Sequence, residues 1–159
     1  MKFLIREAIK EDMPQVLNLI KELAVFEKEE NAVEVTVSDL ERDGFGPKIL
    51  FQCFVAEVDG IIKGMALVYP RYSTWKGPII HLEDLIVTES MRNTGMGTAL
   101  LNEVIKYGNS LGVKRINWEV LDWNEPAINF YKSKGANVMR DWDVVHLNEE
   151  GIKNYMANL

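Results

Sequence analysis

The stretch of this sequence with the greatest potential for chemistry is His81–Leu101, which combines two adjacent carboxylates with a loop that carries two glycines. Glu83 and Asp84 lie in an apolar run typical of a strand, and the loop Arg92–Gly97 leads into an amphipathic helix. The N–H groups of such a loop and the positive end of the helix dipole form a ready anion site. A phosphate cradle beside a possible general base predicts a group-transfer enzyme that uses a phosphorylated cofactor.

The glycine loop is a weak signal when it is taken alone. It lacks the third glycine of the dinucleotide-binding motif, and no Gly-Lys-Ser/Thr follows it as in a P-loop. An ordinary strand-to-helix turn is the alternative interpretation. The flanking Arg92, the strongly amphipathic helix after the loop and the carboxylates before it favour a binding function.

Glu83 and Asp84 are neighbours in the predicted strand, so we expect their side chains to point to opposite faces of the sheet. At most one of them then faces a given site. Both carboxylates could instead be solvated at the end of the sheet. Because an unpaired carboxylate is costly to bury, two acids inside an apolar strand favour a function for at least one of them.

Other candidate groups are fewer. Tyr131 lies in the segment 124–135, where it could also be an amphipathic tyrosine that packs against the core with its hydroxyl group outward. His81 and His146 have no companions at a spacing that suits metal ligands, so we expect no metal site. Cys53 stands in an apolar run, which predicts a buried and inert thiol.

The composition describes an ordinary globular protein. With 159 residues we expect a single domain, residues 1–159, and 47% hydrophobic against 26% charged residues is typical of that class. The net charge of −6 disfavours a general nucleic-acid binder, which needs a basic face, and it is compatible with a cationic substrate. We expect no signal peptide, because charges appear early in the sequence. The sequence contains no run of eighteen apolar residues, so we expect no membrane partner. A cytoplasmic protein is the expectation.

Periodicity and turn residues predict a mixed α/β sheet covered by helices, in the α/β or α+β class. Asp59-Gly60 is a hairpin signal between two strands, and Gly77-Pro78 is expected to separate two others. Asp12, Thr36 and Asn124 are expected to cap helices. We expect strands at 2–8, 51–58, 61–70, 79–87, 115–121 and 142–147, a long helix at about 95–111, a short helix ended by Gly135, and a last helical turn or two around 152–159.

Together these motifs resemble the GNAT superfamily of acetyl-CoA-dependent N-acetyltransferases. Within it the chain is similar to the diamine acetyltransferases, the subgroup of spermidine/spermine and thialysine enzymes. The resemblance covers almost the whole chain, and its most specific parts are LEDLIV at 82–87, RNTGMG at 92–97 and LDWNEPAINFYKSKGA at 121–136. It implies the GNAT fold, with a mostly antiparallel central sheet flanked by helices, acetyl-CoA as the cosubstrate, and a homodimer.

The resemblance also implies roles for individual residues. Glu83 matches the general base of the family and Tyr131 its general acid. The residues expected to contact coenzyme A are Leu85, Ile86, Val87, Arg92, Asn93, Thr94, Gly95, Met96, Gly97, Thr98, Asn124, Pro126, Ala127 and Tyr131. The residues expected to contact the substrate are Phe26, Glu27, Glu83, Asp84, Asn117, Trp118, Glu119 and Asp141.

The leading hypothesis is an N-acetyltransferase that moves the acetyl group of acetyl-CoA to a primary amine of a diamine, polyamine or thialysine-like small molecule, by direct attack in a ternary complex. Asn93 stands where relatives often carry glycine, and Phe26 replaces a tyrosine of the polyamine enzyme. Phe26 and the reduction of the acidic segment after Gly135 to Arg140-Asp141 weaken the case for spermine in particular. The alternatives are a protein-lysine or other small-amine acetyltransferase, or a non-catalytic acyl-CoA-binding module.

Overall fold

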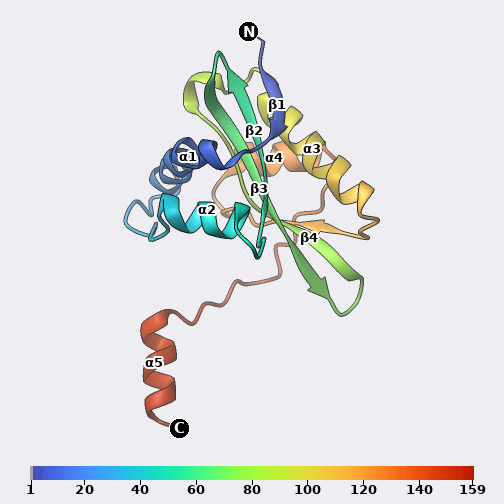
Figure 1. Ribbon diagram of the computed structural model, residues 1–159. Helices are drawn as coiled ribbons and strands as arrows, with labels where there is room; N and C mark the ends of the chain where they lie inside the picture. Colours follow the sequence, from blue (N-terminus) through green and yellow to red (C-terminus); the bar gives the residue numbers. More distant parts are fainter. Residues whose placement is uncertain (1) are drawn as a thin grey trace. The chain divides into compact units, whose positions relative to one another are not determined.

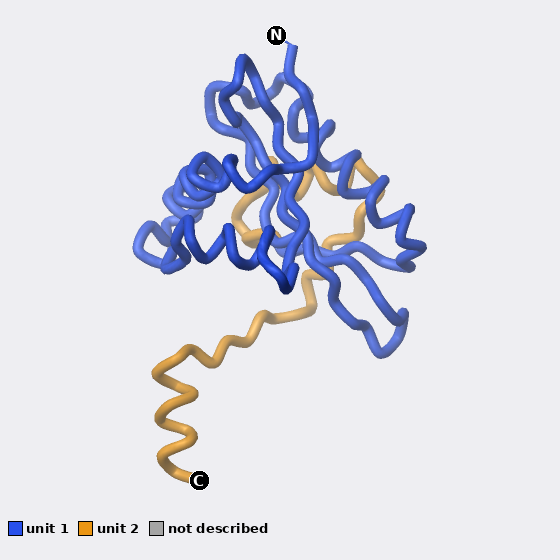
Figure 2. Tube along the Cα trace, in the orientation of Figure 1, with its two compact units in different colours: residues 1–119 blue, residues 120–159 orange. Residues whose placement is uncertain are grey.

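The computed structural model describes residues 2–159, and the chain divides into two compact units, Met1–Glu119 and Val120–Leu159 (Figure 2). The first unit contains, in chain order, β1 (Leu4–Glu7), the 3-10 helix η1 (Lys10–Asp12), α1 (Met13–Phe26), α2 (Val37–Phe45), β2 (Gln52–Val58), β3 (Ile61–Ser73), β4 (Gly77–Val87), the 3-10 helix η2 (Glu89–Met91), α3 (Met96–Ser110) and β5 (Ile116–Asn117). The second unit contains α4 (Glu125–Ser133) and α5 (Glu149–Ala157). None of the helices within residues 2–159 has the length and apolar character that a membrane crossing requires.

The first unit is built around a five-stranded sheet in the order β1-β2-β3-β4-β5. Its first three pairings are antiparallel, and β5 joins β4 in parallel. Helices α1 and α2 cover one face of the sheet and α3 covers the other (Figure 1). The predicted fold class, a mostly antiparallel sheet flanked by helices, is confirmed.

The main core lies between the sheet and the α1–α2 layer. Residues at helical spacing on α1 and at alternate positions on the strands bury their side chains there, as the two periodicities require. Each fully buried Val, Leu, Ile or Met side chain contributes about 1.5–3 kcal/mol to the stability of the fold. The cluster consists of Ala8, Met13, Val16, Leu17, Leu19, Leu40, Cys53, Val55, Ile62, Met65, Leu67 and Ile86.

On the other face, α3 approaches β3 closely at Gly64. A methyl group at this position would lie 3.0 Å from the carbonyl oxygen of Ile86, 3.0 Å from Leu100 Cδ1 and 3.1 Å from Met96 Sδ. Only glycine therefore lets the first turns of α3 pack this near to the sheet without a shift. This approach fixes the height at which the loop before α3 stands above the sheet.

The two hairpins of the sheet follow local turn chemistry. Asp59 and Gly60 both have positive φ, 49° and 79°, as the predicted two-residue turn requires. In the second hairpin, Ser73 Oγ accepts from the N–H groups of Trp75 at 3.2 Å and Lys76 at 3.1 Å. This turn replaces the break predicted at Gly77-Pro78, which was wrong because both of those residues belong to β4.

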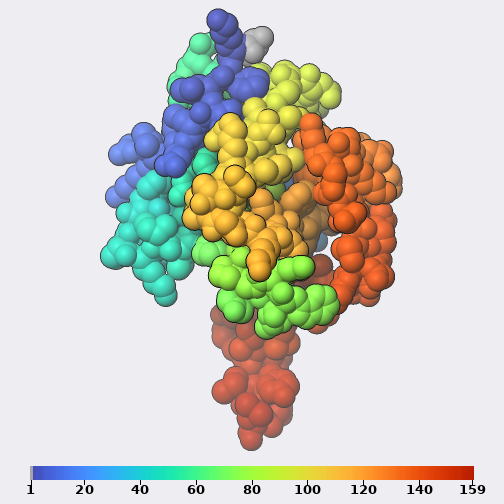
Figure 3. Space-filling view, turned by 90° about the vertical axis from the view of Figure 1, so that its right-hand side faces the viewer, coloured from blue at the N-terminus to red at the C-terminus, as the bar shows by residue number. Residues whose placement is uncertain are grey.

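The tip of the β3–β4 hairpin is an exposed part of the first unit. Figure 3 shows it in green on the surface below α3, which is drawn in yellow to orange. Tyr72 and Trp75 at the tip are 72% and 80% exposed. Single exposed aromatic side chains are normal on a protein surface, so we assign them no role.

Two of the three predicted helix caps are present. Thr36 caps α2 with Asp39 in a reciprocal capping box, and Asn124 Oδ1 accepts from the N–H of Ala127 at 3.4 Å at the start of α4. Asp12 precedes α1 but makes no side-chain cap. Its carboxylate instead accepts from the N–H of Ile9 at 2.9 Å and from two nitrogens of Arg6, at 2.7 and 3.0 Å. The ion pair with Arg6 therefore takes the place of the expected cap on α1.

Two strand predictions need correction. The strand expected at 115–121 is limited to Ile116–Asn117, and the one expected at 142–147 does not form. A strand needs a neighbour for its N–H and C=O groups. The described part of the second unit contains no strand that residues 142–147 could pair with, although Trp142, Val144 and Val145 are 68%, 60% and 89% exposed.

The buried carboxylate of Asp12 yields the first prediction. The hydrogen bond from Arg6 holds the pKa of Asp12 below its usual range. Asp12 therefore stabilises the fold above its unfolded pKa of about 3.9, and this contribution is lost as the pH falls through the lower folded pKa. We expect Asp12→Asn to reduce the free energy of unfolding in urea by about 2 kcal/mol at pH 7, and by much less near pH 2.

A suitable control is Asp59→Asn, because asparagine also tolerates the positive φ of that exposed turn. This control should show no comparable loss at either pH. A deficit of Asp12→Asn that is equally large at both pH values would contradict an ionic role for Asp12.

Candidate active site

The loop between β4 and α3 forms a cradle of unpaired backbone N–H groups. Within residues 2–159, the N–H groups of residues 93–98 donate no hydrogen bond to another protein group. Asn93 and Gly95 have positive φ, 63° and 88°, which turns successive N–H groups toward one side of the loop. Asparagine is, after glycine, the residue that adopts this conformation most readily, so Asn93 fits its position in the loop.

The glycines of the cradle leave its backbone accessible. A methyl group at Gly95 would meet no atom within 4 Å, and one at Gly97 would meet only Val87 Cγ2 at 3.8 Å. The fold therefore does not need the small size of Gly97 for its own packing. The free N–H groups, the N-terminus of α3 and the open space above them suit the pyrophosphate of a coenzyme.

Two contacts from α1 hold this region in place. The Glu22 carboxylate accepts from Thr88 Oγ1 at 3.0 Å and from the N–H of Glu89 at 3.1 Å, where β4 ends. Arg92 at the entrance of the loop lies over the ring of Phe26, with its Cζ atom 5.2 Å from the ring centre. A predicted coenzyme residue and a predicted substrate residue are thus in contact.

Beyond residue 81, β4 has an open edge. Within residues 2–159, β5 pairs with β4 only at Ile80–Ile116 and His81–Asn117. The rest of β4, from 82 to 87, has no strand on that side. Its backbone groups are available to pair with an extended ligand, which is the role predicted for Leu85–Val87.

Glu83 stands on a β-bulge. Leu67 of β3 pairs with Asp84 and the next residue, Val68, pairs with Leu82, so Glu83 is an extra residue that β3 does not match. The bulge interrupts the alternation of side chains. Leu67 belongs to the core beneath α1 and α2, and its partner Asp84 therefore faces that side too.

The Glu83 side chain faces the same side as Asp84, because it contacts Tyr69 and His81. Tyr69 packs against the core beneath α1 and α2, and His81 is its direct partner across the strands. The expectation that Glu83 and Asp84 point to opposite faces was wrong. It assumed regular alternation, whereas Glu83 is itself the extra residue of the bulge.

A chain of hydrogen bonds surrounds Glu83. Tyr69 Oη donates to Glu83 Oε2 at 3.0 Å, and His81 Nε2 lies 3.5 Å from the same oxygen. His81 Nδ1 lies 2.7 Å from Asn117 Nδ2 and 3.4 Å from Arg71 Nη1. Burial lowers the pKa of His81, and burial followed by the bond to Glu83 raises the pKa of Tyr69 to about 12, so both side chains are neutral at pH 7.

Tyr69, His81 and Arg71 were not among the residues predicted for the site. His81 was considered only as a metal ligand, and within residues 2–159 no group of three or more His, Cys, Asp or Glu side chains is placed to hold a metal ion. Tyr69 and His81 meet because β3 and β4 pair in one particular register. No local pattern in the sequence announces that register.

The predicted substrate residues Glu27 and Asp84 form an acidic neighbourhood with Glu83. Burial, followed by the charges of Glu83 and Glu27, raises the pKa of Asp84 to about 6. Burial also raises the pKa of Glu27. Glu119, after β5, is close enough for its charge to raise the pKa of Tyr69. A carboxyl group such as Asp84, whose pKa is raised by neighbouring negative charges, gains from a cationic ligand.

Trp118 follows β5 at the end of the first unit, and the remaining predicted residues lie in the second unit. Asn124 caps α4, Pro126 stands in its first turn, and Tyr131 lies on α4 with its ring centre 5.5 Å from that of Phe130. Asp141 is exposed in the segment after α4. Their roles toward coenzyme and substrate stay predictions.

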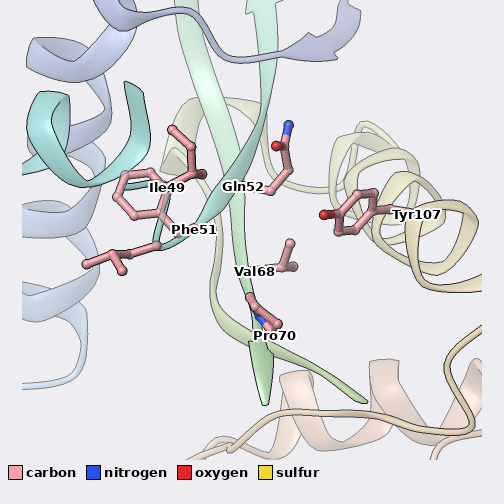
Figure 4. A pocket seen from close by; sticks show the side chains of 7 residues that line it. Ile49, Phe51, Gln52, Val68, Pro70 and Tyr107 are labelled. Carbon is pink, nitrogen blue, oxygen red and sulfur yellow. The ribbon is translucent and has the colours of Figure 1, made fainter. Parts of the chain in front are cut away.

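The first unit also contains a pocket of about 220 Å³ that is separate from these groups (Figure 4). It includes none of the predicted site residues and no carboxylate, so we assign it no part in the acid–base chemistry. Its lining residues are Ile49, Leu50, Phe51, Gln52, Val68, Pro70 and Tyr107.

Comparisons with known proteins agree with this geometry. The model of the Acetyltransferase (GNAT) family matches residues 13–136, and the chain belongs to that family. The thialysine N-epsilon-acetyltransferase of Mus musculus is 37% identical over 140 residues, which cover 83% of this chain and 82% of that protein.

A second relative is the spermidine/spermine N(1)-acetyltransferase-like protein 1 of Homo sapiens. It is 36% identical over 158 residues, which cover 93% of this chain but only 23% of that longer protein. Among solved structures, an integron cassette protein from the mobile metagenome of V. cholerae superimposes with a TM-score of 0.80 at 20% identity, and the match covers 98% of both chains. This last likeness concerns the fold.

The raised pKa of Asp84 yields the second prediction. A carboxyl group whose folded pKa lies above its unfolded value supports the fold below the unfolded pKa of about 3.9, and this support is lost as the pH rises through about 6. Asp84→Asn removes the charge but keeps the shape. We therefore expect it to raise the free energy of unfolding by roughly 2 kcal/mol at pH 8.

Urea unfolding of both proteins at pH 8 and pH 4 measures this difference. Near pH 4 the two proteins should be about equally stable, because Asp84 is then protonated in the folded protein. A variant that is less stable than the wild type at pH 8 would contradict the buried-charge interpretation.

Proposed function

We propose that this protein is an acetyl-CoA-dependent N-acetyltransferase that acetylates a primary amine of a diamine, a polyamine or a thialysine-like small molecule. The proposal rests on the features of one continuous segment of the first unit. Its strand β4 presents Glu83 on a bulge, and the following loop presents six unpaired N–H groups in front of α3. Membership in the acetyltransferase family and the names of the relatives support the same function.

The coenzyme is held largely by the backbone in this proposal. The N–H groups of residues 93–98 bind the pyrophosphate, and Arg92 adds a positive charge at the entrance. Leu85, Ile86 and Val87 pair with the pantetheine arm along the open edge of β4. Asn124, Pro126 and Ala127 at the start of α4 line the coenzyme from the second unit. Acetyl-CoA supplies an acetyl thioester as the second substrate.

Glu83 is the base. A primary ammonium group has a pKa of about 10.4, so its deprotonation at pH 7 costs about 4–5 kcal/mol. The Glu83 carboxylate, which is half exposed, takes that proton directly or through a water molecule. The amine then attacks the thioester carbonyl carbon, so that the C–N bond forms and the C–S bond breaks.

Tyr131 is the acid. Coenzyme A leaves as a thiolate, and the phenol of Tyr131 donates the proton that turns it into a thiol. The attacking nitrogen then loses its surplus proton to the Tyr131 phenolate, which restores the phenol and leaves a neutral amide. No side chain of the protein is acetylated in this sequence of steps, so Cys53 is not needed. Its burial raises the pKa of the thiol to about 12, which leaves it almost entirely protonated and unreactive at pH 7.

The acidic neighbourhood selects the substrate. Glu83 and Glu27 stand close enough to Asp84 for their charges to raise its pKa, and Glu119 adds a further charge near Tyr69. A substrate that carries a second cationic group is attracted to these carboxylates. Phe26, Asn117 and Trp118 offer contacts to its carbon chain, and Asp141 of the second unit contributes another charge. A diamine or an amino acid with a basic side chain fits this pattern.

A protein lysine and another small amine are the alternative substrates of the same site, and an assay with a panel of amines distinguishes them. A pure acyl-CoA-binding module is less well supported. Binding of the coenzyme alone requires neither a carboxylate held by Tyr69 and His81 nor the acidic neighbourhood around it.

We also infer that residues 1–159 act as one acetyltransferase domain, in the cytoplasm and as a homodimer. The family match at 13–136 runs across the boundary between the two units, which supports one functional domain. The segment 142–147 alternates apolar residues but lacks a partner strand within its own unit. A strand of a second copy would satisfy it, which supports the dimer.

The decisive experiment is a thiol-release assay with acetyl-CoA and a panel of amines. The panel contains putrescine, spermidine, thialysine, lysine and a lysine-containing peptide. We expect turnover with the small dicationic amines or thialysine, and Glu83→Gln should lower kcat/KM by about 10²–10⁴-fold while acetyl-CoA still binds. Tight binding of coenzyme A with no turnover of any amine would overturn the enzyme hypothesis, and turnover of the peptide alone would favour a protein substrate.

Tyr131→Phe tests the acid. The variant loses only the phenol hydroxyl group, so we expect kcat to fall by about 10²-fold with a much smaller change in the Kd of coenzyme A, measured by calorimetry. Tyr155→Phe removes the same group from an exposed tyrosine of α5 and serves as the control. If Tyr131→Phe turns over like the wild type, Tyr131 is not the acid.

A further inference from the structure

His81 forms a buried polar cluster behind the proposed base. The whole residue is only 5% exposed, whereas the Glu83 side chain in front of it is 52% exposed. Tyr69 lies beside the imidazole ring, with the ring centres 5.2 Å apart. The proposed mechanism assigns no role to His81, yet a polar side chain buried at this position needs a reason.

The neighbours of His81 determine which ring nitrogen carries the proton. Arg71 Nη1 lies 3.4 Å from Nδ1, and an arginine can only donate. The amide nitrogen of Asn117 lies 2.7 Å from the same atom. We therefore assign Nδ1 as the acceptor. Because burial lowers the pKa of His81, the ring is neutral at pH 7, and its single N–H is at Nε2.

The Nε2–H group is directed at Glu83. Nε2 lies 3.5 Å from Oε2, the oxygen that also accepts from Tyr69 at 3.0 Å. Hydrogen bonds of catalytic groups are often long before substrate binds. Within residues 2–159 no hydrogen bond reaches Oε1. The protein thus holds the carboxylate by one oxygen and leaves the other to receive a proton.

We propose that His81 is a positioning residue for the Glu83 carboxylate: as the Nε2–H tautomer set by Arg71 and Asn117, it acts with Tyr69 to hold Oε2 so that Oε1 is presented to the amine. This inference rests on the proposed function, in which Glu83 is the base. It adds His81 and Tyr69 to the site, and it gives Asn117 a role behind the base rather than only in contact with the substrate. A long, half-exposed side chain such as Glu83 otherwise samples several rotamers.

The test compares two substitutions of His81. His81→Gln can place an amide N–H near the position of Nε2, whereas His81→Leu keeps a similar volume and has no donor. We expect His81→Leu to lower kcat/KM for the amine by about tenfold or more, with the KM for acetyl-CoA unchanged. His81→Gln should recover most of that loss.

A double-mutant cycle with Glu83→Gln separates positioning from a structural role. If His81 acts through the carboxylate, His81→Leu causes no further loss once Glu83 is replaced. Tyr69→Phe, which removes the other donor to Oε2, should behave in the same way and provides a second variant if His81→Leu does not fold.

The outcomes distinguish this inference from the function on which it rests. Wild-type turnover by Glu83→Gln would overturn the base assignment itself. If Glu83→Gln is impaired, the positioning role is overturned when His81→Gln is as impaired as a folded His81→Leu, or when the loss caused by replacing His81 or Tyr69 persists in the Glu83→Gln background. Thermal unfolding of each variant verifies that the loss of activity is not a loss of fold.

Discussion

Glu83 is the residue of β4 that finds no partner on β3, and the arrangement of the candidate active site depends on this one irregularity. In a regular strand Glu83 would point away from Asp84, toward the layer of α3. The bulge brings both carboxylates to the side of α1 and α2. There Glu83 meets Tyr69 and His81, and the charges of Glu83 and Glu27 act on Asp84. An extra residue in one strand thus brings together the proposed base, the side chains that contact it and an acidic neighbourhood.

Strand β4 leads into the anion cradle, so the proposed base Glu83 and the cradle are both positioned by this one strand. Gly64 lets α3 approach the sheet, and Glu22 ties the end of β4 to α1. The cradle carries unpaired N–H groups, and Asp84 resists ionisation. Both features cost stability in the free protein, and both become favourable when an anionic coenzyme and a cationic amine bind. The site is therefore arranged for its ligands and not for the stability of the fold.

The solved structure is informative about the fold, whereas the named relatives are informative about the chemistry. A solved structure with 20% identity superimposes over 98% of the chain, which shows how tolerant the sheet and helices are of substitution. The two relatives described above, which are named as an acetyltransferase and an acetyltransferase-like protein, are 36–37% identical. Because one fold hosts many chemistries, the proposed preference for an amine substrate depends on the carboxylates around Glu83 and not on the architecture.

The sequence by itself determined the features that depend on neighbours along the chain. The turn at Asp59-Gly60, the caps at Thr36 and Asn124, and the glycine loop before α3 each follow from backbone conformations and hydrogen bonds within a few residues. Their motifs also sufficed to indicate the family. Only the tertiary structure decided which distant groups meet. The carboxylate of Asp12 was drawn to Arg6, residues 142–147 had no strand to pair with in their unit, and the bulge brought Glu83 to Tyr69 and His81. These outcomes depend on strand register and on partners far away in the sequence, and a local pattern does not encode them.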